Sequence, residues 1–215
     1  MSSWSVFKIE NIEIVHIKIP FKERFTHSSK SRISSENIIL TIKSKHNIGY
    51  GESIPREYVT GETPQTVIKT LQKKIIPHFK NTTIRSKTIL LKKLWEFRKT
   101  LNTNELSAFG AFEIAILHLA AKEIDLTIED IFKFLKIKPE PQKEIQYSAI
   151  IGDKPLLLMI LKAFTIRKRG FKQVKIKIDE KTLYKLKYLS KILNKQSIRI
   201  DSNSGLIYKN FEKTL

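Results

Sequence analysis

The sequence contains no cysteine, which excludes disulfide bonds, zinc–thiolate sites and thiol catalysis. It also lacks an uninterrupted apolar run of about 18 residues, so a membrane-spanning helix is not expected. The segment Met1-Ser2-Ser3-Trp4-Ser5-Val6-Phe7-Lys8 lacks the apolar core of a secretory signal. We therefore expect a cytoplasmic protein without a membrane partner.

Acidic residues are scarce: 21 Asp and Glu stand against 40 Lys and Arg, which gives a net charge of +19. Such a balance favours attraction to nucleic acid or other polyanions. The lysines, however, alternate with apolar residues along the whole chain, as in Lys73-Lys74-Ile75-Ile76. This indicates solvated faces in a lysine-rich composition, so we do not expect a nucleic-acid partner. A basic polyanion-binding module stays open as an alternative.

The first half predicts an α+β domain, with strands before helices. Alternation over residues 6–19 predicts a strand that Pro20 ends, followed by a polar loop from Phe21 to Ser35. Two further strands, Glu36–Ser44 and Ile48–Glu52, complete a three-stranded antiparallel meander. After a loop from Pro55 to Glu62, helices are expected over about 64–75, 86–100, 104–125 and 127–135, the first capped by Thr63 with Pro64 at its first position.

Beyond Pro139-Glu140-Pro141 the pattern changes to alternating strands and helices. Strands are predicted at 146–151, 173–178 and 197–201, and helices at 155–168 and 180–193. This order is typical of a parallel sheet with helical crossovers. We therefore expect a first domain over residues 1–140 and a second over 141–215.

The most informative segment is Val174-Lys175-Ile176-Lys177-Ile178. Strand side chains alternate, so Lys175 and Lys177 share one face and the apolar residues the other. Each ammonium disfavours protonation of its neighbour, which favours the neutral amine that a general base needs. Asp201 ends the next strand, where its carboxylate could hold a hard cation.

Each of these residues also has a plainer interpretation. The lysines could lie in water on an edge strand, although a strand inside a parallel series is expected to be buried on both faces. Asp201 could simply cap a following helix. Glu52 and Glu62 lie beside turn glycines, which favours surface or turn positions, and His118 is expected to be a satisfied packing residue.

Several motifs together resemble one known family. They are Ile48-Gly49-Tyr50-Gly51-Glu52, Tyr58-Val59-Thr60-Gly61-Glu62-Thr63, the helix around Phe112-Glu113-Ile114-Ala115, the Lys-x-Lys strand and Arg199-Ile200-Asp201-Ser202-Asn203. In this order they resemble the muconate lactonizing enzyme subgroup of the enolase superfamily, related to mandelate racemase. The subgroup includes muconate cycloisomerases, o-succinylbenzoate synthases and dipeptide epimerases.

The resemblance implies an isomerase with a capping domain over residues 1–140 and a TIM-type (β/α) barrel that begins near Ile145. It implies that Lys177 removes a proton α to a carboxylate, that Lys175 assists it and that Asp201 is the first of three Mg²⁺ ligands. The substrate would be a small carboxylate, a dipeptide or a cyclic acid, with a weak preference for dipeptide epimerisation. The implied substrate contacts are Arg24, Phe25, Thr26, Arg56 and Tyr58.

Two departures from the family matter. His118 stands where the family usually has an acidic residue. More seriously, the chain beyond Ile145 has room for about three of the eight barrel units. We therefore expect a C-terminally truncated, incomplete site with weak Mg²⁺ binding and negligible turnover. The open sheet predicts association of copies, instability or a missing continuation. A non-catalytic remnant is the other alternative.

Overall fold

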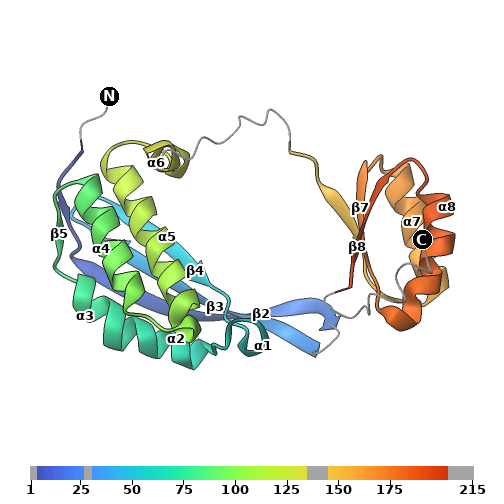
Figure 1. Ribbon diagram of the computed structural model, residues 1–215, viewed down its shortest axis with the longest axis horizontal. Coiled ribbons are helices and arrows are strands. Elements are labelled where there is room, and N and C mark those ends of the chain that lie inside the picture. Colours follow the sequence, from blue (N-terminus) through green and yellow to red (C-terminus); the bar gives the residue numbers. More distant parts are fainter. Residues whose placement is uncertain (1–3, 27–30, 135–144, 203–215) are drawn as a thin grey trace. The chain divides into compact units, whose positions relative to one another are not determined.

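The computed structural model describes residues 4–26, 31–134 and 145–202 (Figure 1). The chain divides into two compact units: unit 1 comprises residues 1–25 and 32–140, and unit 2 comprises residues 26–31 and 141–215. Among the described residues, no helix combines the length and the apolar character that crossing a membrane requires.

Unit 1 contains a three-stranded sheet covered on one face by helices and a separate two-stranded sheet. Its strands are β1 (Phe7–Lys8), β2 (Asn11–Thr26), β3 (Ser31–Lys43), β4 (Ile48–Ser53) and β5 (Thr83–Ile84). Its helices are α1 (Glu57–Thr60), α2 (Pro64–Thr70), the π-helix η1 (Leu71–Ile75), α3 (Ile76–Phe79), α4 (Lys87–Lys99), the 3₁₀ helix η2 (Thr103–Glu105), α5 (Leu106–Glu123) and α6 (Ile128–Phe134).

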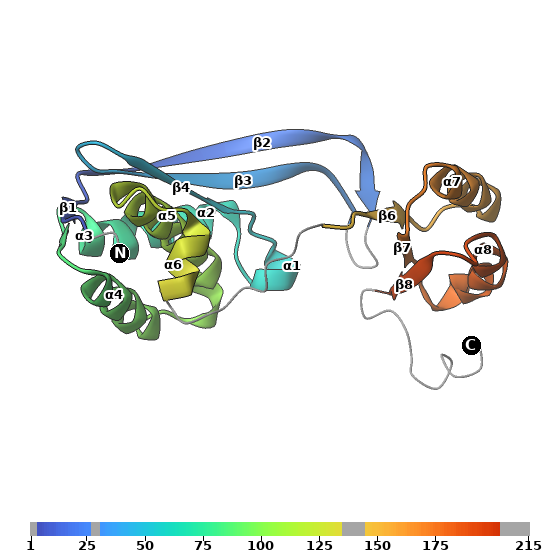
Figure 2. The same cartoon turned by 90° about the horizontal axis from the view of Figure 1, so that it is seen from above.

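The predicted three-stranded meander is confirmed, with strand order β2-β3-β4. Alternate residues of β3 (Ile38, Leu40 and Ile42) are fully buried in the core of unit 1. Figure 2 shows the helices on one side of this sheet. The predicted cap is also confirmed, because the Thr63 hydroxyl accepts the Thr66 N–H at the start of α2.

Two predictions for the first strands are wrong. The strand does not end at Pro20, because β2 continues to Thr26. Most of the expected loop from Phe21 to Ser35 is strand, since β3 begins at Ser31, and residues 27–30 lie outside the described part. The reason is that β2 is an edge strand of its sheet. A proline there can turn its missing N–H side away from the neighbouring strand, so the ladder is not broken.

Three small elements were not predicted as separate elements. Helix α1 lies inside the expected loop from Pro55 to Glu62 and ends at Gly61, which has a left-handed φ of 71°. The two-residue strands β1 and β5 pair antiparallel, Phe7 with Ile84 and Lys8 with Thr83. All three are shorter than the window over which hydrophobic periodicity can be recognised.

Unit 2 has the predicted β-α-β-α-β order, with bounds β6 (Ser148–Ile151), α7 (Leu156–Lys168), β7 (Gln173–Lys177), η3 (Glu180–Lys185), α8 (Leu186–Ile192) and β8 (Ser197–Asp201). The sheet is parallel with order β6-β7-β8. Its core packs apolar strand residues such as Val174 and Ile176 against Met159, Ala163 and other residues of the two crossovers. Both α7 and α8 lie on the same side of the sheet (Figure 2).

Close packing of α5 on β4 depends on two glycines, Gly49 and Gly51. A Cβ at Gly51 would lie 1.9 Å from the Ala111 carbonyl oxygen, and one at Gly49 would lie 2.1 Å from the Ala115 carbonyl oxygen. Since the obstructing atoms are helix backbone, they cannot move aside without displacing α5. The Gly-x-Gly pair of the sequence therefore sets the distance between sheet and helix.

We predict that Gly51→Ala destabilises unit 1 by about 1–3 kcal/mol or more, because the added methyl group separates α5 from β4. The matched control is Gly110→Ala, since a Cβ at Gly110, inside α5, meets nothing within 4 Å. This control should raise stability by about 0.5–1 kcal/mol. Urea unfolding followed by tryptophan fluorescence measures both, because Trp4 and Trp95, the only tryptophans, belong to unit 1. Equal effects of the two substitutions would contradict the packing argument.

Candidate active site

The Lys-x-Lys strand β7 is the middle strand of the parallel sheet in unit 2. Val174 and Ile176 are fully buried beneath the crossover helices, whereas Lys175 and Lys177 are half-buried. The alternation of the strand therefore places both lysines on one face, as the sequence predicted, and this face is opposite α7 and α8.

Asp201 lies on the same face, at the carboxyl end of β8. It is in register with Lys177, and the Nζ of Lys175 lies 2.7 Å from its Oδ2. The two side chains of this pair are 33% and 20% exposed, respectively. The structure thus brings the three residues together at one edge of the sheet. The pair is partly solvated, so its main effect is to orient the side chains rather than to hold the strands together.

The expectation that β7 is buried on both faces is wrong for the described part of the chain. On the lysine face, Ile150 pairs in register with Lys175 and remains 55% exposed, and Arg199 beside Lys175 is exposed as well. The helices of unit 2 cover only the other face, so here the lysine face remains accessible to a ligand.

The carboxylates of unit 2 bear directly on the expected metal site. In the described residues, no group of three or more His, Asp or Glu side chains could hold a metal ion. Asp153 is held by Lys185, and Asp179 caps the helix η3 by accepting the Thr182 N–H. Asp201 lies at the carboxyl end of β8, the edge of the sheet where parallel α/β folds bind ligands. Its carboxylate suits one coordination position of a hard cation. Whether a helix follows Asp201 lies outside the described residues.

Lys185 is a charged residue that the sequence reasoning missed. It is only 7% exposed, and its Nζ donates to Asp153 Oδ1 at 2.7 Å and to the Lys154 carbonyl at 2.8 Å. These bonds tie the loop after β6 to the helix after β7, at the same edge of the sheet as Asp201. No sequence signal marked this contact, because Lys185 and Asp153 lie 32 residues apart along the chain.

The predicted substrate contacts lie in two segments, the end of β2 and the region around α1. Arg24, Phe25 and Thr26 belong to the end of β2, and the structure does not describe their side chains. Arg56 precedes α1, and within the described part of the chain its Nε is buried without a hydrogen-bond partner. Tyr58 is half-buried in α1. Their role in binding substrate stays a prediction.

Glu62 is not the surface or turn residue that the sequence predicted. It is 1% exposed, and its carboxylate accepts the N–H groups of Ser107 at 2.9 Å and Ala108 at 3.2 Å. It thereby caps the amino terminus of α5, where backbone donors lack helical partners. Burial raises the pKa of Glu62 above its usual range, against the opposing effect of the two N–H bonds. Glu62 anchors the segment that carries Arg56 and Tyr58.

Glu52 and His118 agree with their plainer interpretations. Glu52 is exposed and accepts a 2.5 Å bond from the Asn37 amide. His118 is half-buried, and its Nδ1 accepts the Tyr50 N–H at 3.2 Å. Neither residue joins a catalytic arrangement in the described structure.

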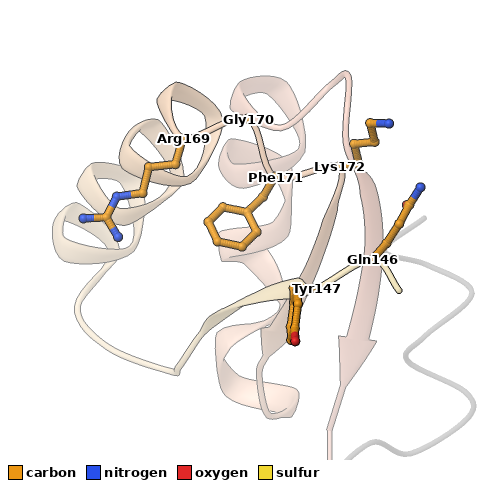
Figure 3. A pocket seen from close by; sticks show the side chains of 6 residues that line it. All are labelled: Gln146, Tyr147, Arg169, Gly170, Phe171 and Lys172. Atoms are coloured by element: carbon orange, nitrogen blue, oxygen red, sulfur yellow. The ribbon is translucent and has the colours of Figure 1, made fainter. Parts of the chain in front are cut away.

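A hollow of about 230 Å³ lies at the opposite edge of the sheet from Asp201 (Figure 3). Its lining residues flank the starts of β6 and β7: Gln146, Tyr147, Arg169, Gly170, Phe171 and Lys172. It is wide open, since Tyr147 is 81% exposed. Because ligands of parallel α/β sheets bind at the carboxyl ends of the strands, this hollow is not the candidate active site.

Comparison with known proteins finds similarity to racemases, dipeptide epimerases and a muconate lactonizing enzyme. The N-succinyl-L-Arg/Lys racemase of Bacillus cereus is 22% identical over 213 residues, which cover 97% of this chain and 55% of the racemase. Its crystal structure matches with a TM-score of 0.81 at 21% identity. The dipeptide epimerase of Enterococcus faecalis V583, complexed with Mg and L-Leu-L-Tyr, matches with a TM-score of 0.81 at 22% identity, over 96% of this chain and 57% of the epimerase.

A muconate lactonizing enzyme from Mycobacterium smegmatis also matches, with a TM-score of 0.78 at 16% identity, over 96% of this chain and 56% of that enzyme. The chain has the fold of these racemase, epimerase and lactonizing-enzyme structures over the matched part. No family model matches the chain. The chain spans about half the length of these relatives, so the fold comprises the capping domain and the first part of the barrel.

The raised pKa of Glu62 predicts a specific pH dependence of stability. Because the unfolded carboxyl ionises first, near its ordinary pKa of 4.5, the contribution of Glu62 to stability should fall as pH rises from there through its raised folded pKa. Glu62→Gln should remove this decrease. Glu62→Ala should lower stability at every pH by about 1–3 kcal/mol, because two buried N–H groups lose their acceptor. Urea unfolding between pH 4 and 8 measures all three proteins, and parallel profiles for wild type and Glu62→Gln would contradict the assignment.

Proposed function

We propose that this chain carries the base and one metal ligand of an active site that removes a proton α to a carboxylate, as in dipeptide epimerases and amino-acid racemases. The observation that carries the proposal is the meeting of Lys175, Lys177 and Asp201 on one face at the carboxyl edge of the sheet. The enolase-superfamily fold supports it.

The two lysines have distinct parts in this proposal. Lys177 lies two residues closer to the carboxyl end of β7 than Lys175. Its amine would accept the α-proton of the substrate. Lys175, whose ammonium lies 2.7 Å from Asp201, would hold that carboxylate in place and add positive charge beside the developing negative charge. A general base positioned in this way typically contributes a factor of about 10²–10⁴ to the rate.

Asp201 would supply one carboxylate oxygen to Mg²⁺, the ion present in several structures of dipeptide epimerases with this fold. Mg²⁺ would supply positive charge that favours ionisation next to the substrate carboxylate. The described residues contain no cluster of three or more His, Asp or Glu side chains that could hold a metal ion, and the relatives extend well beyond the matched part. We therefore expect the 215-residue chain alone to bind Mg²⁺ weakly and to turn over negligibly.

The proposed substrate is a dipeptide or an N-acylated amino acid. This class follows from the relatives, which include dipeptide epimerases and an N-succinyl-Arg/Lys racemase. The guanidinium of Arg56, with its buried Nε lacking a partner in the described structure, suits a substrate carboxylate or amide oxygen. Arg24, Phe25, Thr26 and Tyr58 are the other proposed contacts. Association of copies stays a prediction.

The test is exchange of the substrate α-proton for solvent deuterium, followed by proton NMR with Mg²⁺, dipeptides and N-succinyl amino acids. Residues 1–202 are joined to the part of the Bacillus cereus racemase that the chain does not match, which supplies the rest of the barrel. Lys177→Ala in this chimaera should slow exchange at least about 100-fold. The control Lys172→Ala, an exposed lysine just before β7, should stay within about two-fold of the parent. Exchange that survives Lys177→Ala would refute Lys177 as the base.

A further inference from the structure

Unit 1 contains a second hollow, of about 280 Å³, unrelated to the strand residues of the proposed active site. It is formed where the continuous helical segment α2–η1 packs beside the start of α5. Its lining residues are mostly basic or hydroxyl-bearing: Thr66, Lys69, Thr70, Lys73, Lys74, Asn104 and Glu105.

Positive charges outnumber negative charges among the residues that line this hollow. Its one carboxylate, Glu105, is already engaged, because Oε1 lies 2.5 Å from the Nζ of Lys74 and Oε2 accepts the Asn102 N–H at 3.0 Å. These contacts lower the pKa of Glu105 despite the opposing effect of its burial, so it stays ionised and paired with Lys74. Within the described residues, Lys69 and Lys73 have no carboxylate partner. Two positive charges are therefore left at the hollow.

Helical spacing directs the lining groups to one side. Thr66, Lys69, Thr70 and Lys73 follow the i, i+3, i+4, i+7 pattern of a single helix face. Like charges four residues apart repel each other, so this arrangement is unfavourable without a counter-ion. The π-helix Leu71–Ile75 interrupts the α-helix here, a feature often found at functional sites.

We propose that this hollow binds a small phosphate-bearing anion, such as a phosphate monoester or pyrophosphate. The lysine ammonium groups, the Thr70 hydroxyl and the Asn104 amide are donors that line it, whereas the Thr66 hydroxyl donates to the Thr63 carbonyl. These donors match an anion with several acceptor oxygens. Lysine binds phosphate as a point charge, and the two lysines without partners in the described structure match the charge of a dianion. A small hollow on one helix face does not fit an extended nucleic-acid backbone.

The experiment titrates the full chain with pyrophosphate at constant ionic strength and follows backbone amide signals by NMR. Wild type should show saturable shifts centred on residues 69–74 and on Asn104. The double variant Lys69→Gln/Lys73→Gln should bind at least ten-fold more weakly. The matched control, Lys45→Gln/Lys80→Gln, removes the same charge from exposed lysines of unit 1 that do not line the hollow, and it should bind within two-fold of wild type.

Stability provides an independent readout. Pyrophosphate should raise the melting temperature reported by tryptophan fluorescence in wild type and in the control, but not in the Lys69→Gln/Lys73→Gln variant. Without pyrophosphate, this variant should melt at or above the wild-type temperature, because a repulsion has been removed, and that result separates lost binding from unfolding. Shifts spread over the surface lysines, equal weakening in both double variants, or tighter binding of a single-stranded oligonucleotide at the same lysines would overturn the proposal.

Discussion

The candidate active site depends on one constraint: a parallel strand has two faces, and in the described part of unit 2 helices cover only one of them. Val174 and Ile176 are fully buried on the helix side. The strict alternation of β7 then places Lys175 and Lys177 on the other side. The parallel register between β7 and β8 adds Asp201 to the same face, opposite Lys177. Hydrophobic burial on one face thus places the polar groups on the other, where the Lys175–Asp201 ion pair orients two of them.

Unit 1 obeys a comparable constraint between sheet and helix. Gly49 and Gly51 allow the backbone of α5 to approach β4, and Glu62 satisfies the backbone donors at the start of that helix. The same glutamate ends the segment that carries Arg56 and Tyr58. The packing of the capping domain and the placement of its predicted substrate-contact segment therefore rest on the same helix.

Much of the architecture could be predicted because it depends on long, periodic patterns. The parallel order of unit 2, the capped helix at Thr63 and the shared face of Lys175 and Lys177 all follow from local periodicity. The failures have a common cause, since each depends on where a strand or a side chain lies in three dimensions. Pro20 is tolerated because β2 is an edge strand, and Glu62 is buried because it meets α5, which is distant in sequence.

Lys185 illustrates the same limit for charged residues. The sequence around Lys185 gave no sign that this residue is buried. In the structure its ammonium group donates hydrogen bonds to the Asp153 carboxylate and the Lys154 carbonyl. A buried charge is tolerated only with such partners, and those partners lie about thirty residues away along the chain. The roles of Lys177, Lys175 and Asp201 remain proposals that rest on their shared face and on the fold.

We propose that the lysine face at the carboxyl edge of the sheet in unit 2 is a site for a divalent cation and a base. The most direct measurement adds Mn²⁺ in place of Mg²⁺ and records paramagnetic broadening of backbone amide signals. We predict that Mn²⁺ binds weakly and broadens the amide signals of Lys177, Ile178 and Asp201. This broadening should disappear in Asp201→Asn and persist in Asp153→Asn. Broadening centred on Asp153 or Asp179, or unchanged in Asp201→Asn, would contradict it.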